Sequence, residues 1–123
     1  MITLYHITPK ANISSIATQG LLINQRSCMT KASDSADKIR TYGVIPIFLC
    51  EDPLRLAKEQ LTSGWIEQSD PVVLSVDVYG VPVVQEYAHL TWFKDVKHMC
   101  FTWVSLKNIE PQRIAISSHV LFL

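Results

Sequence analysis

One histidine near the start of the chain stands in a setting suited to polar-ligand chemistry. His6 and Thr8 belong to Leu4-Tyr5-His6-Ile7-Thr8, and His6 falls at the C-terminal end of an expected strand. An imidazole can donate or accept a hydrogen bond at neutral pH, and a hydroxyl can do both. A lone histidine at a strand end is usually a capping or surface residue, so a binding role depends on the neighbouring Thr8 and on the helix that follows.

The motifs of the common enzyme classes are absent. No P-loop, G-x-G-x-x-G, H-E-x-x-H or G-x-S-x-G occurs, and the chain has only 4 glycines, so a glycine-rich phosphate loop is unsupported. The cysteines, Cys28, Cys50 and Cys100, are widely spaced with no C-x-x-C. This spacing argues against a disulfide framework and a thiolate zinc site, and no metal is expected.

The first elements must position His6. Residues 2–7 are β-branched and aromatic and predict a strand that ends at Pro9, which has no N–H for a ladder. Asn12 is a plausible N-cap for a helix with an apolar stripe, and Gly20 stands where a C′ glycine is expected. The polar, weakly periodic stretch 24–43 predicts a long functional loop.

The remaining segments mostly favour strands. Residues 44–50 form an apolar run, which Pro46 assigns to an edge or a bulge. Asp52-Pro53 predicts a helix to about Leu61, and the alternation over 71–79 predicts a strand. Further β-favouring segments are 83–87, 99–106 and 114–123. The expected class is α+β, in one domain over residues 1–123.

Composition indicates a neutral, core-forming domain. Hydrophobic residues make up 48% of the 123 residues and charged residues 18%, which excludes a disordered chain. Eleven Lys and Arg balance eleven Asp and Glu, so any nucleic-acid contact must be local. Neither a signal peptide nor an apolar run of membrane-spanning length is present. A cytoplasmic protein with no membrane partner is therefore expected.

Residues 4–22, LYHITPKANISSIATQGLL, resemble the opening of the ADP-ribosyltransferase superfamily. The likeness is to DNA-modifying ADP-ribosyltransferase toxins and RNA 2′-phosphotransferases. These proteins begin with a strand that ends in His-x-Thr, followed by a helix and by a Gly-Leu pair where the chain returns to the core. VIPIFLC, VVLSVDV and TWVSLKNIEPQRIAIS are similar, in order, to the family's later motifs. The resemblance implies an ADP-ribosyltransferase-like split β-sandwich with two or three short helices and a cleft between two sheets.

The resemblance also implies NAD as substrate. His6 would hydrogen-bond a ribose hydroxyl, and Thr8 would fix the same end of the dinucleotide. Tyr42 or Phe48 would supply a stacking face, with Tyr42 preferred because it borders the polar loop. Four basic residues of that loop would meet the pyrophosphate or a nucleic-acid substrate: Arg26, Lys31, Lys38 and Arg40.

One expected catalytic feature is missing. The family's transferases carry a glutamate on the closing hairpin strand, which here reads His98-Met-Cys-Phe-Thr-Trp-Val-Ser105 with no acid. Glu86 is the nearest preceding carboxylate and would reach the cleft from a loop.

Three functions stay open. The first is transfer of ADP-ribose to a nucleic acid or a protein, by analogy as a toxin or conflict factor, with a possible antitoxin or inhibitor as partner. The second is a degenerate member that acts as a nucleotide-binding or inhibitory module. The third is RNA 2′-phosphotransferase chemistry, which needs a phosphate clamp.

Overall fold

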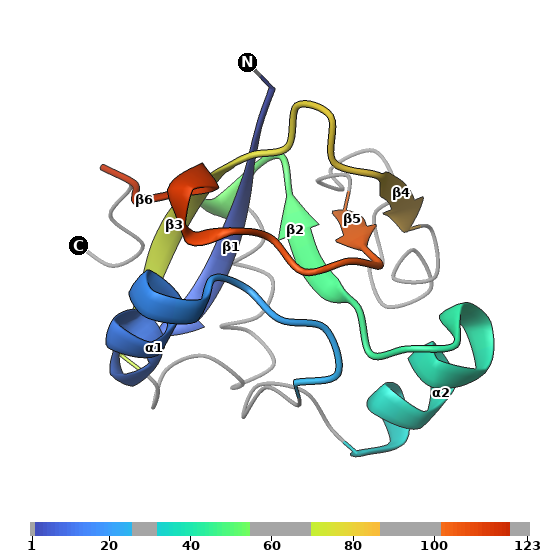
Figure 1. The fold of residues 1–123 in the computed structure, drawn as a ribbon. Coiled ribbons are helices and arrows are strands. Elements are labelled where there is room, and N and C mark those ends of the chain that lie inside the picture. The colour runs from blue at the N-terminus through green and yellow to red at the C-terminus, as the bar shows by residue number, and fades with distance from the viewer. Residues whose placement is uncertain (1, 26–31, 55–69, 87–101, 119–123) are drawn as a thin grey trace.

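The computed structural model describes residues 2–25, 32–54, 70–86 and 102–118, which form a six-stranded antiparallel sheet with few helices (Figure 1). The strands lie in the order β4-β5-β2-β1-β3-β6. Their bounds are Thr3–Pro9 (β1), Ile47–Cys50 (β2), Pro71–Asp77 (β3), Val83–Glu86 (β4), Thr102–Ser105 (β5) and Ile114–Ile116 (β6). The helices are the 3-10 turns η1 (Lys10–Asn12) and η5 (Pro111–Arg113) and the α-helices α1 (Ile13–Gln19) and α2 (Ala32–Tyr42). The expected α+β class is confirmed.

The centre of the sheet is the long pairing of β1 with β3. It runs from Thr3 opposite Asp77 to Pro9 opposite Pro71 without a break. Leu4 faces Val76 and His6 faces Leu74 across this ladder, and the two β3 residues are buried. Because alternate residues of a strand share a face, Leu4 and His6 lie on the same side of the sheet. His6 is the middle residue of β1, not its C-terminal end as expected, and it shares this face with Leu4 and Thr8.

In contrast, β1 and β2 are paired at a single position, Tyr5 opposite Cys50. Figure 1 shows the two strands close together at this point and diverging toward the end of β1. On its far side β2 pairs fully with β5, from Ile47 opposite Ser105 to Cys50 opposite Thr102. The sheet is thus two three-stranded halves that separate beyond Tyr5, on the side of His6 and Thr8.

The helix α1 packs on the face of the sheet that carries Leu4 and His6 (Figure 1). Ile16 is its one buried residue and joins the main apolar cluster. The other fully or nearly buried members of that cluster are Leu4, Leu21, Ile47, Leu49, Leu74, Val76, Val78 and Ile109. The core thus fixes α1 against the point where β1 and β2 separate.

Gly20 ends α1 and brings the chain back to the sheet, as the sequence predicts. Its N–H donates to the carbonyl of Ile16 at 2.8 Å, and its φ is +78°. A Cβ atom at this position would overlap the carbonyl oxygen of Ile109. The next residue, Leu21, exchanges two backbone hydrogen bonds with Ile109, at 2.9 and 2.8 Å. Only glycine fits this junction, because both the backbone conformation and the space exclude a side chain.

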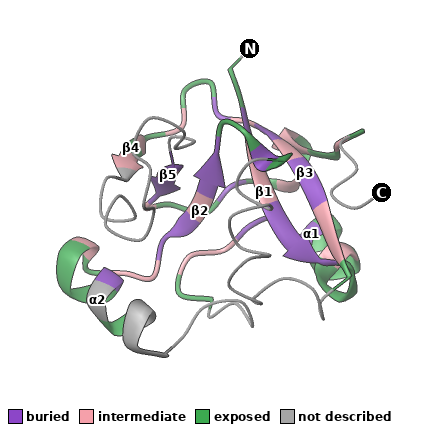
Figure 2. Ribbon diagram, turned by 180° about the vertical axis from the view of Figure 1, so that it is seen from behind, coloured by how far each residue is buried: buried purple, intermediate pink, exposed green. Residues whose placement is uncertain are grey.

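The prediction of a loop over 24–43 is wrong for its second half, which forms α2. Gly43 ends the helix with φ +80°, and its N–H donates to the carbonyl of Ile39 at 2.7 Å. Ile39 is exposed, and Figure 2 shows α2 as a mostly exposed element beside the sheet. The residues of α2 show little helical periodicity in the sequence, because this helix has no apolar stripe to bury.

The described strands form one sheet whose halves join at a single paired position, and the split β-sandwich implied by the resemblance stays a prediction. Two further expectations need correction. β2 is an interior strand, not an edge, because Pro46 precedes the strand and leaves its ladder intact. Asn12 makes no side-chain capping bond to α1. The helix expected to run to Leu61 lies largely outside the described residues. No helix in the described ranges has the length and hydrophobicity to cross a bilayer.

Candidate functional site

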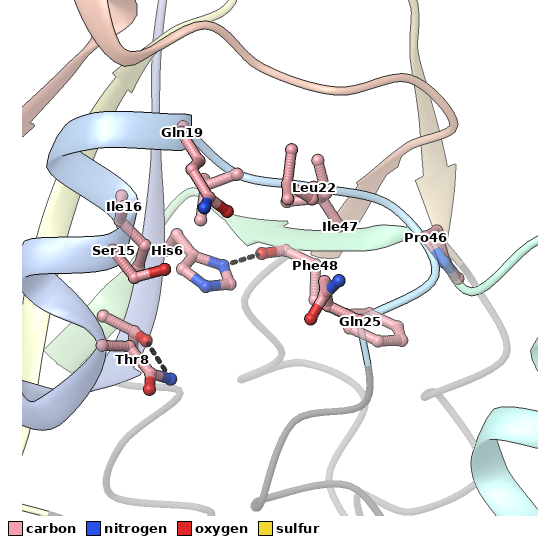
Figure 3. Close-up of a pocket in the computed structure, with 13 residues that line it drawn as sticks. His6, Thr8, Ser15, Ile16, Gln19, Leu22, Gln25, Pro46, Ile47 and Phe48 are labelled. Atoms are coloured by element: carbon pink, nitrogen blue, oxygen red, sulfur yellow. Dashed lines mark hydrogen bonds between the residues drawn. The ribbon is translucent and has the colours of Figure 1, made fainter.

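A hollow of about 240 Å³ opens where β1 and β2 separate, and α1 borders it (Figure 3). Its floor is made of buried residues from all three elements and from the return after α1: Thr8, Ile16, Gly20, Leu21, Pro46 and Ile47. Its rim carries the exposed polar residues Asn12, Ser15, Gln19 and Gln25. His6, Leu22 and Phe48 are half-buried between floor and rim. Six of the 13 lining residues are polar, so the hollow is more polar than the mainly apolar pockets that enclose drug-sized ligands.

His6 connects the two separating strands. Its Nδ1 lies 2.7 Å from the backbone carbonyl oxygen of Phe48, an atom that can only accept a hydrogen bond. Nδ1 must therefore carry the proton, and in the neutral ring Nε2 has a free lone pair. Figure 3 shows the ring with one nitrogen toward Phe48 and the other directed away from it. His6 thus offers a hydrogen-bond acceptor to a ligand in the hollow.

The protonation state of His6 supports this assignment. Burial lowers the pKa of His6 below its ordinary value of 6.5 because the charged ring loses solvation. The hydrogen bond to the Phe48 carbonyl raises the pKa and offsets part of this effect. The net direction is downward, so the ring is mainly neutral at pH 7 and Nε2 is an acceptor under those conditions.

Thr8 supplies a second polar group at the floor. Its side chain is 3% exposed, and Oγ1 accepts a hydrogen bond from Nδ2 of Asn12 at 3.4 Å. Because Asn12 donates, the hydroxyl proton of Thr8 remains available for a ligand oxygen. His6 and Thr8, which the sequence singled out, therefore meet in one site with opposite hydrogen-bonding preferences.

Of the two aromatic candidates, Phe48 lines this hollow and Tyr42 does not. Phe48 lines the hollow from β2, whereas Tyr42 is the last residue of α2 and is not among the lining residues. The preference for Tyr42 depended on its bordering a polar loop. That segment is instead the helix α2, which ends at Tyr42. The next residue along the chain that lines the hollow is Pro46, just before β2.

The basic residues do not gather at the hollow. Arg40 is exposed on α2, Lys38 is buried on the same helix, and neither lines the hollow. Arg26 and Lys31 lie outside the described residues. Within the described ranges, the lining residues include no lysine, arginine, aspartate or glutamate. The site as described is therefore uncharged at neutral pH, and a phosphate group would find no cation there.

Glu86 is not brought together with His6. It is the last residue of strand β4, not part of a loop, and it pairs with Thr102. Thr102 pairs with Cys50 and Cys50 with Tyr5, so three strand spacings separate Glu86 from β1. At about 4.8 Å per spacing this is about 14 Å. The combination of His6, Tyr42 and Glu86 expected from the sequence does not form a common site.

The polar rim was not predicted from the sequence. Asn12, Ser15 and Gln19 are three and four positions apart, which places them on one face of the turn and helix. The signal was available as an uncharged polar stripe beside the core residue Ile16. No sequence pattern indicates Gln25. It lies at the site only because the chain turns back toward the sheet after Gly20.

Two comparisons with known proteins bear on this site. No protein-family model matches the chain, and no curated protein is significantly similar to it. Among the described residues, no three or more histidine, cysteine, aspartate or glutamate side chains form a group that could hold a metal ion. A function is therefore proposed from the geometry of the hollow. It is also proposed from the resemblance of residues 4–22 to the opening of the ADP-ribosyltransferase superfamily.

Proposed function

We propose that the protein binds NAD in the hollow between β1 and β2 and transfers ADP-ribose to a macromolecular acceptor, either nucleic acid or protein. The observation that carries the proposal is the hydrogen bond from His6 Nδ1 to the Phe48 carbonyl at 2.7 Å. It fixes the ring so that Nε2 can accept a hydrogen bond from a ribose hydroxyl. The His-x-Thr resemblance assigns His6 this same role.

The size and polarity of the hollow suit one end of the dinucleotide. At about 240 Å³ it is smaller than the roughly 300–1,000 Å³ of pockets that enclose a drug-sized ligand. It would therefore hold a ribose and its base and leave the pyrophosphate outside. The uncharged lining agrees with this placement, because a phosphate without a cation would lose solvation without compensation.

The residues of the hollow have separate roles in this proposal. His6 accepts from a ribose hydroxyl, Thr8 donates to a ribose oxygen, and Phe48 offers its ring to the base. Cleavage of the nicotinamide–ribose bond develops positive charge on the ribose, and fixed acceptors near the ribose stabilise such charge. Holding the ribose in one orientation also lowers the entropic part of the barrier.

A second candidate is a nucleotide-binding or inhibitory module without transferase activity. The observation that favours it is the lack of any carboxylate among the described residues that line the hollow, with Glu86 three strands from β1. The same lining has no cationic clamp, which makes RNA 2′-phosphotransferase chemistry the least supported of the three functions.

Labelled NAD separates these candidates. The purified protein is incubated with NAD labelled in the adenylate part and with a cell lysate, and nucleic acid and protein are then counted separately. The proposal predicts label in one fraction with wild-type protein and none with His6→Ala. NAD binding without transfer or glycohydrolysis would leave the binding module as the function. No binding at all by folded protein would overturn both.

A further inference from the structure

Besides Asn12, whose amide donates to Thr8, the rim of the hollow carries two primary amides that the proposed ribose contacts do not use. Gln19 ends α1 and Gln25 follows the return of the chain, and both side chains are exposed while lining the hollow. Figure 3 shows their amide groups on opposite sides of the hydrogen bond between His6 and Phe48. Neither amide forms a hydrogen bond with another side chain or with the backbone in the described part of the chain.

The hydroxyl of Ser15 completes this rim. Ser15 and Gln19 are four positions apart on α1, so their side chains lie on the same face of the helix, one turn apart. Ile16, between them in sequence, is buried in the core and fixes the rotation of the helix. The helix therefore cannot turn its polar face away from the hollow without exposing Ile16.

We infer that Gln19 and Gln25 recognise the carboxamide of the nicotinamide ring, so that the hollow discriminates NAD from its deamidated, carboxylate-bearing analogue. This inference rests on the proposed function and names the residues that would set its substrate specificity.

The chemical reason is the pairing of donors and acceptors. An amide side chain both donates and accepts, and a carboxamide is its complement in both respects. A carboxylate accepts only, so a glutamine carbonyl facing it would be left unpaired. The carboxylate would also bring a negative charge to a lining that has no lysine or arginine among its described residues. Both effects favour the amide.

Binding calorimetry with NAD and with nicotinic acid adenine dinucleotide tests the inference on the full chain. The wild-type protein is expected to bind NAD about threefold to tenfold more tightly, which is the net effect of one ordinary hydrogen bond made by exposed side chains. Gln19→Ala and Gln25→Ala are each expected to bring this ratio toward one. Gln19→Arg, which supplies a cation at the rim, is expected to favour the acid.

Gln112→Ala is the matched control, because Gln112 is an exposed glutamine in η5 that does not line the hollow. It should keep the wild-type ratio. Equal binding of the two dinucleotides by wild-type protein, or a ratio unchanged in both Gln19→Ala and Gln25→Ala, overturns the inference while NAD binding itself still stands. Failure of NAD to bind folded wild-type protein overturns the proposed function and this inference together.

Discussion

The imidazole of His6 donates from Nδ1 to the backbone carbonyl of Phe48 at 2.7 Å, and it does so just beyond the last backbone pair of β1 and β2. The His6 side chain thus donates a hydrogen bond to a backbone carbonyl of β2 at a point where β1 and β2 are no longer paired through their backbones. The same bond fixes the tautomer of the ring and directs Nε2 away from Phe48. One contact therefore serves both the stability of the sheet and the proposed chemistry of the hollow.

Replacing His6 should reduce both stability and binding. We expect His6→Ala to lower the free energy of unfolding by about 1–3 kcal/mol, because it removes the hydrogen bond and leaves the Phe48 carbonyl without its imidazole donor. The rise in Tm that we expect NAD to cause in wild-type protein should be absent in this variant. Urea denaturation and thermal scans with and without NAD measure the two effects.

Ser75→Ala is the control for that variant. The Ser75 hydroxyl donates to the Ala115 carbonyl at 3.3 Å, between β3 and β6 and away from the hollow. It should cost up to about 1 kcal/mol and keep the full response to NAD. If His6→Ala protein still responds to NAD as strongly as Ser75→Ala protein, the ligand does not depend on His6.

Stability should depend on pH through His6. Its pKa is lower in the folded protein than the ordinary 6.5, so the unfolded chain binds more protons between those two values. The free energy of unfolding should therefore rise with pH through this window, and the full contribution should be present above about 6.5. Below 6.5 stability should fall as pH decreases. Denaturation curves for wild-type and His6→Gln protein between pH 5 and 8 isolate the contribution, which the variant should lack; equal slopes would contradict it.

Two glycines with similar positive φ values should respond differently to alanine. At Gly20 the new Cβ would meet the Ile109 carbonyl, whereas at Gly43 nothing lies within 4 Å. The φ values of +78° and +80° are ones that side chains rarely adopt, so both substitutions cost about 1–3 kcal/mol in backbone strain. The clash should bring Gly20→Ala to about 3–5 kcal/mol. Similar losses in chemical denaturation would mean that α1 does not meet residue 109 as closely as described.

Glu86 should be dispensable for binding. It lies on β4, with β5 and β2 between it and β1. We expect Glu86→Gln to bind NAD within about twofold of the wild-type affinity, because charges separated by more than the Debye length of about 10 Å are largely screened. A tenfold or larger loss of NAD affinity in this variant, measured by calorimetry, would mean that Glu86 contributes to the binding site.

The first 22 residues were the most predictable part of the fold. β-branched residues before Pro9, an apolar stripe around Ile16 and a glycine at position 20 all indicate the structure that forms, since local preference and burial agree. The helix α2 could not be predicted in the same way, because its described side chains are mostly exposed and its ends depend on capping.

The site was predictable only in part, for a physical reason. His6 and Thr8 are close in sequence, and Phe48 joins them because β2 pairs beside β1. No local pattern indicates that this pairing stops after Tyr5, and the hollow exists because it stops. Gln25 and Pro46 belong to the site through that tertiary arrangement alone. Glu86 was misplaced because the sequence does not reveal the strand order.

Nitrogen chemical shifts of the His6 ring test the central claim most directly. Long-range proton–nitrogen NMR at pH 7.5 distinguishes a protonated ring nitrogen from a bare one, and the spectrum of His6→Gln protein assigns His6 among the four histidines. We predict a proton on Nδ1, a bare Nε2, and a saturable shift of Nε2 as NAD is added. A proton on Nε2, or an Nε2 signal that NAD leaves unchanged, would contradict the account.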